Sequence, residues 1–309
     1  MISTLRQLTE HLAAQRERQT VAVVCGHDAQ TIEAVGQAID PGFAKAVLVD
    51  TMPDAPERLM AGGRSAHVAH CRANDDAEAA AMAVDLVRQG RADMLMKGLV
   101  STDVLLRAVL NKQQGLLPQG AVLTHVAVAE LPAYDKLLLF SDAAVIPYPT
   151  PQQRRAQVAA LVQTARALGI GEPRLSLIHC SEHVSDKFPH TADYRAIAKE
   201  AEDGRWGRVR IDGPLDVRTS LDAATLRVKG ITSPIEGRAD ALLFPDIEAG
   251  NTFYKTVTLF GRAKTAGVLC GTTRPVVLPS RGDDAPTKLY SLALAALLSS
   301  VAQAGNAAL

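Results

Sequence analysis

Residues Thr20–Val49 read TVAVVCGHDAQTIEAVGQAIDPGFAKAVLV. Thr20–Cys25 is a short, valine-rich apolar run that predicts a buried strand, Ala29–Ile39 has helical spacing, and Ala46–Val49 predicts a second strand. A strand, a helix and a strand at this spacing form a right-handed βαβ unit, in which the two strands are parallel. This stretch therefore predicts an α/β protein built on a largely parallel sheet.

The same alternation continues along the chain. Further strands are predicted at 67–70, 93–96, 174–179, 208–211, 241–244 and 275–278, and further helices at 75–89, 101–111, 151–168, 191–201, 217–228, 248–262 and 286–301. The alternation breaks at Gly120–Ala129 and Lys136–Phe140, two extended runs joined by a short polar turn that leaves no room for a helix. We predict that these two strands are antiparallel and that the break is the entry to a second domain.

The composition is that of a globular protein. The 309 residues carry 33 basic and 33 acidic side chains, and this balance argues against a polybasic binder of nucleic acid or membrane surfaces. Hydrophobic residues make up 47% of the chain and aromatic residues 4%, which favours helices packed on buried strands. The longest apolar run, Leu292–Leu298, is far shorter than a membrane span, and the N-terminus shows no secretory signal. The four scattered cysteines favour reduced thiols in a cytoplasmic protein.

Polar residues gather where the predicted strands end, which is where open α/β sheets bind their ligands. In the segment Met96–Asp103, Lys97 and Gly98 turn the chain, and Ser101 or Thr102 precedes a helix. A lysine beside a helix N-terminus suits a phosphate group, whereas a capped helix with a surface lysine is the simpler interpretation of this segment alone.

A second strand end is the segment Pro279–Asp284. Arg281 could hold a phosphate through two hydrogen bonds while Ser280 donates another. Asp283 or Asp284 could accept a proton or simply cap the final helix. On its own, this segment is evenly balanced between a ligand site and a helix cap.

Two further strand ends carry acidic residues. Asp246 and Glu248 suit the start of a helix, and Asp212 lies in Ile211–Pro214, which we expect to be a strand followed by a tight turn. Together, the four strand ends predict one cleft between two α/β lobes.

Several well-known motifs are absent from the sequence. It contains no GxGxxG, GxxxxGK[ST], HExxH or GxSxG, so nicotinamide, nucleoside-triphosphatase and α/β-hydrolase chemistry have little support. His179 and His183 are four apart at a predicted strand end, where ordinary loop or core histidines are favoured over metal ligands. We therefore predict no metal site.

The sequence resembles a known family. Pro245–Lys255 (PDIEAGNTFYK) and Ala266–Asp284 (AGVLCGTTRPVVLPSRGDD) resemble the phosphate acetyltransferase/butyryltransferase family. Met96–Asn111 (MKGLVSTDVLLRAVLN) and Ile211–Leu215 (IDGPL) are similar to other blocks of that family, in the same order. The similarity covers nearly the whole chain and is closer to the short phosphate butyryltransferase branch than to the acetyltransferases.

The resemblance implies the two-domain α/β/α fold of the isocitrate and isopropylmalate dehydrogenases. The first domain would be discontinuous, formed by residues 1–122 and 272–309, and the second, residues 123–271, would carry the dimer interface. The implied reaction is the reversible transfer of a short-chain acyl group between coenzyme A (CoA) and inorganic phosphate, directly in a ternary complex. CoA would be a substrate, with no tightly bound cofactor, and the expected assembly is a cytoplasmic homodimer without a nucleic-acid or membrane partner.

The resemblance also implies site residues. Ser280 and Arg281 match the Ser-Arg pair that lines the active site and stabilises the transition state, and Arg107 matches an arginine that contacts phosphate. The acetyltransferases place their proton-accepting aspartate several residues after that pair, at about the place of Thr287 in this chain. Asp283 is therefore the first choice for the base and Asp284 the second. The remaining predicted substrate-binding residues are Lys97, Gly98, Ser101, Thr102, Asp246, Asn251 and Lys255.

Two other functions stay open at this point. The chain could be another metabolic enzyme with the same fold, such as a fatty-acyl phosphate synthase or a decarboxylating dehydrogenase. It could also be a CoA-binding relative that has lost catalysis, although the presence of both Ser280 and Arg281 argues against this. The sequence decides neither the acyl-chain preference nor the direction of the reaction.

Overall fold

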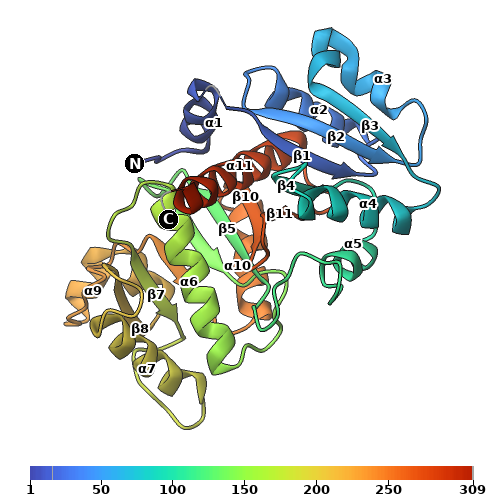
Figure 1. Ribbon diagram of the computed structural model, residues 1–309. Coiled ribbons are helices and arrows are strands. Elements are labelled where there is room, and N and C mark those ends of the chain that lie inside the picture. The colour runs from blue at the N-terminus through green and yellow to red at the C-terminus, as the bar shows by residue number, and fades with distance from the viewer. Residues whose placement is uncertain (16, 308–309) are drawn as a thin grey trace. The chain divides into compact units, whose positions relative to one another are not determined.

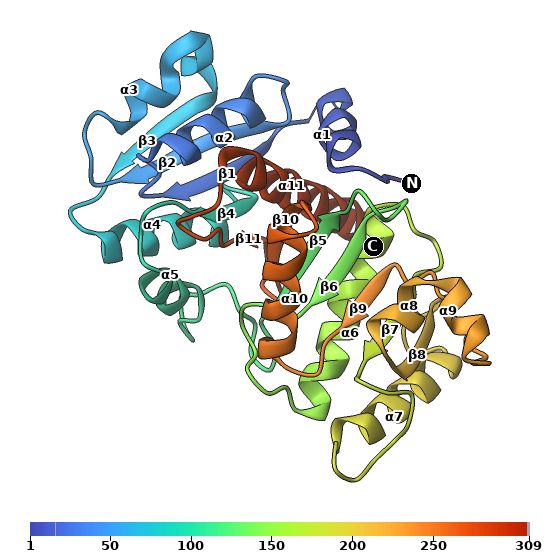
Figure 2. The same ribbon diagram turned by 180° about the vertical axis from the view of Figure 1, so that it is seen from behind.

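The computed structural model describes residues 1–15 and 17–307, which form two compact units (Figures 1 and 2). The N-terminal unit contains residues 5–123 and the chain from Lys264 on, so it is discontinuous in sequence. The middle unit contains Met1–Thr4 and Thr124–Ala263. The units divide after residues 123 and 263, whereas the sequence analysis drew its boundaries after 122 and 271, and that domain division stays a prediction.

The N-terminal unit is built on a sheet with the strand order β3-β2-β1-β4-β11-β10. Strands β3, β2, β1, β4 and β11 are parallel to one another, and β10 is antiparallel to β11. The strands are β1 (Gln19–Val24), β2 (Ala44–Asp50), β3 (Val68–Arg72), β4 (Met94–Lys97), β10 (Lys264–Cys270) and β11 (Val276–Val277). The helices are α1 (Leu5–Ala14), α2 (Ala29–Ile39), α3 (Ala55–Met60), α4 (Asp76–Arg88), α5 (Thr102–Val109) and α11 (Ala285–Ala307), with a 3₁₀ segment at Ala61–His67.

Helix α11 is the longest element of this unit (Figure 1). By length and composition, Ala285–Ala304 could cross a membrane, yet 56% of its most apolar window is buried inside the protein. The helix packs against β10 and α2. Its apolar side chains therefore form part of the core of an α/β unit.

The middle unit has its own sheet, with the order β5-β6-β9-β7-β8. Its strands are β5 (Thr124–Glu130), β6 (Leu138–Ser141), β7 (Arg174–Ile178), β8 (Arg210–Leu215) and β9 (Ala241–Leu243). Its helices are α6 (Pro151–Ala167), α7 (His190–Glu202), α8 (Val217–Leu221), α9 (Ala223–Val228) and α10 (Ile247–Leu259). Strands β5 and β6 are antiparallel, as predicted, and the other pairs are parallel. The core contains a buried cluster around Phe140 and Phe244.

The structure differs from the sequence analysis in several elements, and helices α1 and α3 were not predicted at all. Strand β10 was not predicted, because Gly267 interrupts its apolar pattern; the Gly267 N–H donates to Ser291 on α11 (2.9 Å). The expected turn at Ile211–Pro214 lies inside β8, which continues to Leu215. The predicted helix 217–228 is broken at Asp222, whose extended backbone ends α8 while its carboxylate caps α9 through the Ala224 N–H (2.9 Å).

Candidate active site

Four parallel strands of the N-terminal unit end at the same edge of the sheet. Strands β2, β1, β4 and β11 are consecutive neighbours, and they run in the same direction. Asp50 ends β2, Asp28 follows β1, Lys97 ends β4, and Ser280 follows β11. Because neighbouring strands lie about 4.8 Å apart, the loops after these strands are brought close together. This is the edge at which α/β sheets bind their ligands.

Lys97 is a buried cation at this edge. Its side chain is 2% exposed, and its Nζ donates to the Gly98 carbonyl (3.2 Å). Burial lowers the pKa of Lys97, and the positive charges of Arg281 and Lys288 lower it further. Asp28 and Asp283 act in the opposite direction, and Asp28 is paired with Lys288. A bound anion would relieve the remaining repulsion between Lys97 and Arg281, so this arrangement is suited to holding a phosphate group.

Gly98 allows two backbone segments to approach closely. A Cβ at this position would lie 2.2 Å from the Cys25 carbonyl oxygen. The Gly98 N–H donates to Val24 (2.8 Å) and the Leu99 N–H to Cys25 (2.7 Å), which continues the pairing of β4 with β1 beyond Lys97. Gly98 is therefore required by the backbone geometry that positions Lys97.

Asp28 and Lys288 form an ion pair at the same edge, and the sequence analysis did not select either residue. The Lys288 Nζ lies 3.0 Å from the Asp28 Oδ1 and donates to the Thr31 hydroxyl (3.1 Å). Burial acts to raise the pKa of Asp28, but hydrogen bonds from Thr31 and Lys288 outweigh it, and the pKa lies below its ordinary value. Asp28 directly precedes α2, where an N-cap was the only signal in the sequence.

The loop after β11 presents an arginine. The Ser280 N–H donates to the Asp283 Oδ2 (2.8 Å), and the Thr287 N–H donates to the Asp284 Oδ1 (3.0 Å). Asp284 therefore caps the helix. The sequence analysis had given helix capping as one of two possible roles for Asp283 and Asp284. Within the described chain, the exposed Arg281 has no hydrogen bond or ion pair and is available to a ligand.

Helix α5 carries the other residues selected in this unit. Ser101 caps the helix by accepting from the Val104 N–H (3.3 Å), as the sequence allowed, and Thr102 is exposed. Arg107 is also exposed, and the described residues include no ion-pair partner for it. Asp103 lies four residues earlier on the same helix, yet among the described residues it forms no ion pair with Arg107, so the guanidinium is available to a ligand.

Three selected residues belong to α10 of the middle unit or to its N-cap. Asp246 caps this helix by accepting from the Ala249 N–H (2.8 Å). Asn251 donates to the Ala143 carbonyl (2.9 Å), and the Lys255 Nζ lies 5.1 Å from the centre of the Tyr254 ring. Each of the three thus has a structural contact of its own.

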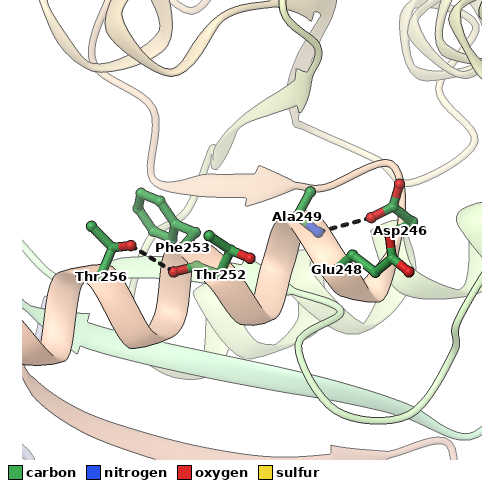
Figure 3. A pocket seen from close by; sticks show the side chains of 6 residues that line it. All are labelled: Asp246, Glu248, Ala249, Thr252, Phe253 and Thr256. Atoms are coloured by element: carbon green, nitrogen blue, oxygen red, sulfur yellow. Dashed lines mark hydrogen bonds between the residues drawn. The ribbon is translucent and has the colours of Figure 1, made fainter.

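Figure 3 shows a hollow beside the first turns of α10. It has a volume of about 550 Å³ and is lined by Asp246, Glu248, Ala249, Thr252, Phe253 and Thr256. Asp246 and Glu248 lie at one end, and Phe253 and Thr256 lie at the other, so the lining is mixed polar and apolar.

Two histidines of the middle unit, His179 and His190, contact each other. The His190 Nε2 lies 3.3 Å from the His179 Nδ1, and burial lowers the pKa of both side chains. Among residues 1–15 and 17–307, no group of three His, Cys, Asp or Glu side chains is arranged to hold a metal ion.

Comparison with known proteins identifies the family. A family model described as "Phosphate acetyl/butaryl transferase" matches residues 60–296. The chain belongs to this family. Phosphate butyryltransferase from Clostridium acetobutylicum is 38% identical over 284 residues, which cover 92% of this chain and 94% of that protein. This similarity extends the family assignment to nearly the full length.

Solved structures of the family and beyond it have the same fold. A branched-chain phosphotransacylase from Enterococcus faecalis V583 matches with a TM-score of 0.81 and 30% identity, covering 91% of this chain and 99% of that chain. A 4-hydroxythreonine-4-phosphate dehydrogenase from Klebsiella pneumoniae matches with a TM-score of 0.53 at 9% identity, covering 92% of this chain and all of that chain. The second likeness shows the fold alone. The predicted dehydrogenase-like α/β fold is therefore confirmed.

Proposed function

We propose that this phosphate acyltransferase transfers a short-chain acyl group reversibly between CoA and inorganic phosphate, directly in a ternary complex. The observation that carries the proposal is the buried Lys97 beside Arg281 and Lys288 at the carboxyl edge of the sheet. Phosphate is the substrate that this concentration of positive charge would recognise.

The reaction requires positive charge at two places. Phosphate oxygen attacks a thioester in one direction, and CoA thiolate attacks an acyl phosphate in the other. Both directions pass through a tetrahedral intermediate with negative charge on the former carbonyl oxygen and on the phosphate group. Hydrogen-bond donors aimed at such an oxygen stabilise a transition state by about 3–4 kcal/mol each.

We assign the catalytic roles to the loop after β11. Ser280 and Arg281 donate to the developing negative charge, and Asp283 fixes the loop through the Ser280 N–H (2.8 Å). Arg107 and Lys97 bind phosphate. The guanidinium of Arg107 is exposed and therefore available for this role. The further proposed substrate contacts are Gly98, Ser101, Thr102, Asp246, Asn251 and Lys255.

The decisive experiment measures thiol release from acetyl-CoA and butyryl-CoA with and without inorganic phosphate. Phosphate-dependent release is the expected result, and Arg281→Ala should lower it at least about 100-fold, because an oxyanion donor is lost. Arg91→Ala is the matched control, since Arg91 is an exposed arginine before β4, at the opposite edge of the same sheet.

Other results would contradict the proposal. Phosphate-independent release would indicate a thioesterase. CoA binding without turnover on any acyl chain would indicate a non-catalytic relative. Retained turnover in Arg281→Ala would remove Arg281 from the mechanism.

We propose that CoA acts as a substrate and that no cofactor stays tightly bound. We further propose a cytoplasmic homodimer with neither nucleic-acid nor membrane partners. The balance of 33 basic and 33 acidic residues supports the absence of a polyanionic partner. The middle unit is proposed to carry the dimer interface, and it exposes large apolar side chains at Val228, Leu259 and Phe260. Light scattering of the purified protein tests this assembly.

A further inference from the structure

His27 and Asp50 form a hydrogen-bonded dyad at the carboxyl edge of the sheet. The His27 Nδ1 lies 2.8 Å from the Asp50 Oδ1 and 3.1 Å from the Oδ2. Asp50 is fully buried, and its Oδ1 also accepts from the Met52 N–H (2.9 Å). A carboxylate can only accept, so in the neutral imidazole Nδ1 carries the hydrogen and Nε2 has the lone pair.

The Nε2 edge of the His27 ring, away from Asp50, is open to a ligand. Its side chain is 27% exposed, and no described residue bonds Nε2. A histidine oriented by a buried carboxylate, with its second nitrogen free, is the arrangement that proton-transferring histidines have in enzymes.

The dyad lies beside the proposed phosphate site. His27 precedes Asp28, whose carboxylate pairs with Lys288, and β1 is the direct neighbour of β4, which ends at Lys97. Since strands are spaced at about 4.8 Å, the loop after β1 is about one strand from Lys97 and two from Ser280.

The charged groups around His27 come from several elements. Asp50 on β2 contacts the imidazole ring. The next residue along the chain, Asp28, forms the ion pair with Lys288 of α11. The Arg58 guanidinium on α3 donates to the His27 carbonyl (2.9 Å).

The two aspartates favoured by the sequence as proton acceptors have structural tasks. Asp283 accepts from the Ser280 N–H (2.8 Å), and Asp284 caps α11 through the Thr287 N–H (3.0 Å). One oxygen of each carboxylate is thus engaged by the backbone. The His27 Nε2, in contrast, has no hydrogen bond to any described residue.

We propose that His27, oriented by Asp50, transfers the proton of the CoA thiol. This inference rests on the proposed acyltransferase function. When CoA attacks an acyl phosphate, the S–H bond breaks and its proton moves to the His27 Nε2. The thiolate forms the S–C bond, the C–O bond to phosphate breaks, and phosphate leaves with the bonding pair. In the opposite direction, the departing thiolate takes the proton back from the imidazolium.

The test measures acyl-CoA formation from acyl phosphate and CoA at pH 7 and at pH 9.5. His27→Gln should lower kcat about 100-fold at pH 7, the usual contribution of a general base. The defect should shrink to less than about 10-fold at pH 9.5, because a thiol with a pKa of about 8.5 ionises there without assistance. Free imidazole should restore part of the activity of His27→Ala, and Asp50→Asn should lower kcat in the same pH-dependent manner.

His11→Gln is the matched control, since His11 is an exposed histidine on α1 and its ring bonds Gln15 (3.1 Å). Circular dichroism melting of each variant separates lost folding from lost chemistry. A His27→Gln defect below about threefold, or one that is equal at both pH values, would overturn the role of His27. The wild-type enzyme separates the two proposals: without phosphate-dependent turnover the acyltransferase function fails, whereas with it a fully active His27→Gln overturns this inference alone.

Discussion

Lys288 on α11 and Asp28 at the start of α2 are 260 positions apart in sequence, yet their Nζ and Oδ1 atoms lie 3.0 Å apart. The lysine side chain is 4% exposed and the aspartate side chain 17%. The pair joins the last helix of the N-terminal unit to its first βα loop. Both members of the pair act on Lys97: the Lys288 charge lowers the pKa of Lys97, and the Asp28 carboxylate raises it. The contact thus contributes to stability, and it neutralises the Lys288 charge next to the proposed phosphate site.

Removing Asp28 should destabilise the N-terminal unit. Asp28→Ala leaves the buried Lys288 without its carboxylate and removes the N-cap of α2, so we expect a loss of about 3–5 kcal/mol. The double variant Asp28→Ala/Lys288→Met should recover much of this loss, because it buries no unpaired charge. Urea denaturation measures the free energy of unfolding of the single and the double variant. A single-variant loss below about 1 kcal/mol would show that the pair is not energetically coupled.

Lys97→Met should raise stability at neutral pH while abolishing activity. The folded-state pKa of Lys97 lies below its ordinary value of 10.5, because burial and the neighbouring cations disfavour the ammonium. Between the two values the unfolded chain binds more protons, so wild-type stability should rise with pH there. At pH values below both pKa values, the free-energy cost of burying the charged Lys97 is fully present.

Thermal unfolding from pH 7 to 10.5 checks this expectation. Lys97→Met should melt about 3 °C higher than the wild type at pH 7, and the difference should shrink as the pH rises toward 10.5. Lys45→Met, an exposed position on β2, should show no such pH dependence. An unchanged difference across the range would mean that Lys97 carries no electrostatic penalty.

Gly98→Ala should destabilise the protein by about 3 kcal/mol, as expected for a methyl group forced into a closed space. The added Cβ would lie 2.2 Å from the Cys25 oxygen, and two backbone hydrogen bonds keep the segments from separating. Gly171→Ala is the control, because a Cβ there meets no atom within 4 Å. Equal melting temperatures for the two variants would contradict the steric argument.

Arg107→Ala should raise the KM for phosphate at least about 10-fold with little change in stability. Arg107 makes no ion pair or hydrogen bond with the described residues, so its removal breaks no intramolecular contact. Steady-state kinetics at varied phosphate concentration, with Arg91→Ala as the control, test this. A KM for phosphate that matches the wild type would exclude Arg107 from the phosphate site.

Asp246→Ser separates helix capping from substrate binding. Serine is also a good N-cap, so the stability of α10 should change by less than about 0.5 kcal/mol. The lost carboxylate should alter the hollow of Figure 3, and we expect a severalfold change in the KM for acyl-CoA. A variant with wild-type kinetics would leave Asp246 as a cap alone.

Much of the fold followed from local patterns. Apolar strand runs alternating with helical spacing predicted the parallel sheet, and the short polar turn before Lys136–Phe140 predicted the antiparallel pair β5–β6. Local patterns failed where a tertiary contact compensates for weak signals. Strand β10 tolerates Gly267 because Ser291 accepts from its N–H, and Asp222 breaks a helical pattern by capping its own second half.

The site divides in the same way. The sequence by itself determined the family and selected Lys97, Arg107, Ser280 and Arg281, because blocks of consecutive residues carry that information. Only the tertiary structure decided that Lys97 is buried and that Asp28 meets Lys288. Strand order brings the ends of β1, β2, β4 and β11 to one edge, and strand order is set by packing across the whole sheet, which no local pattern records.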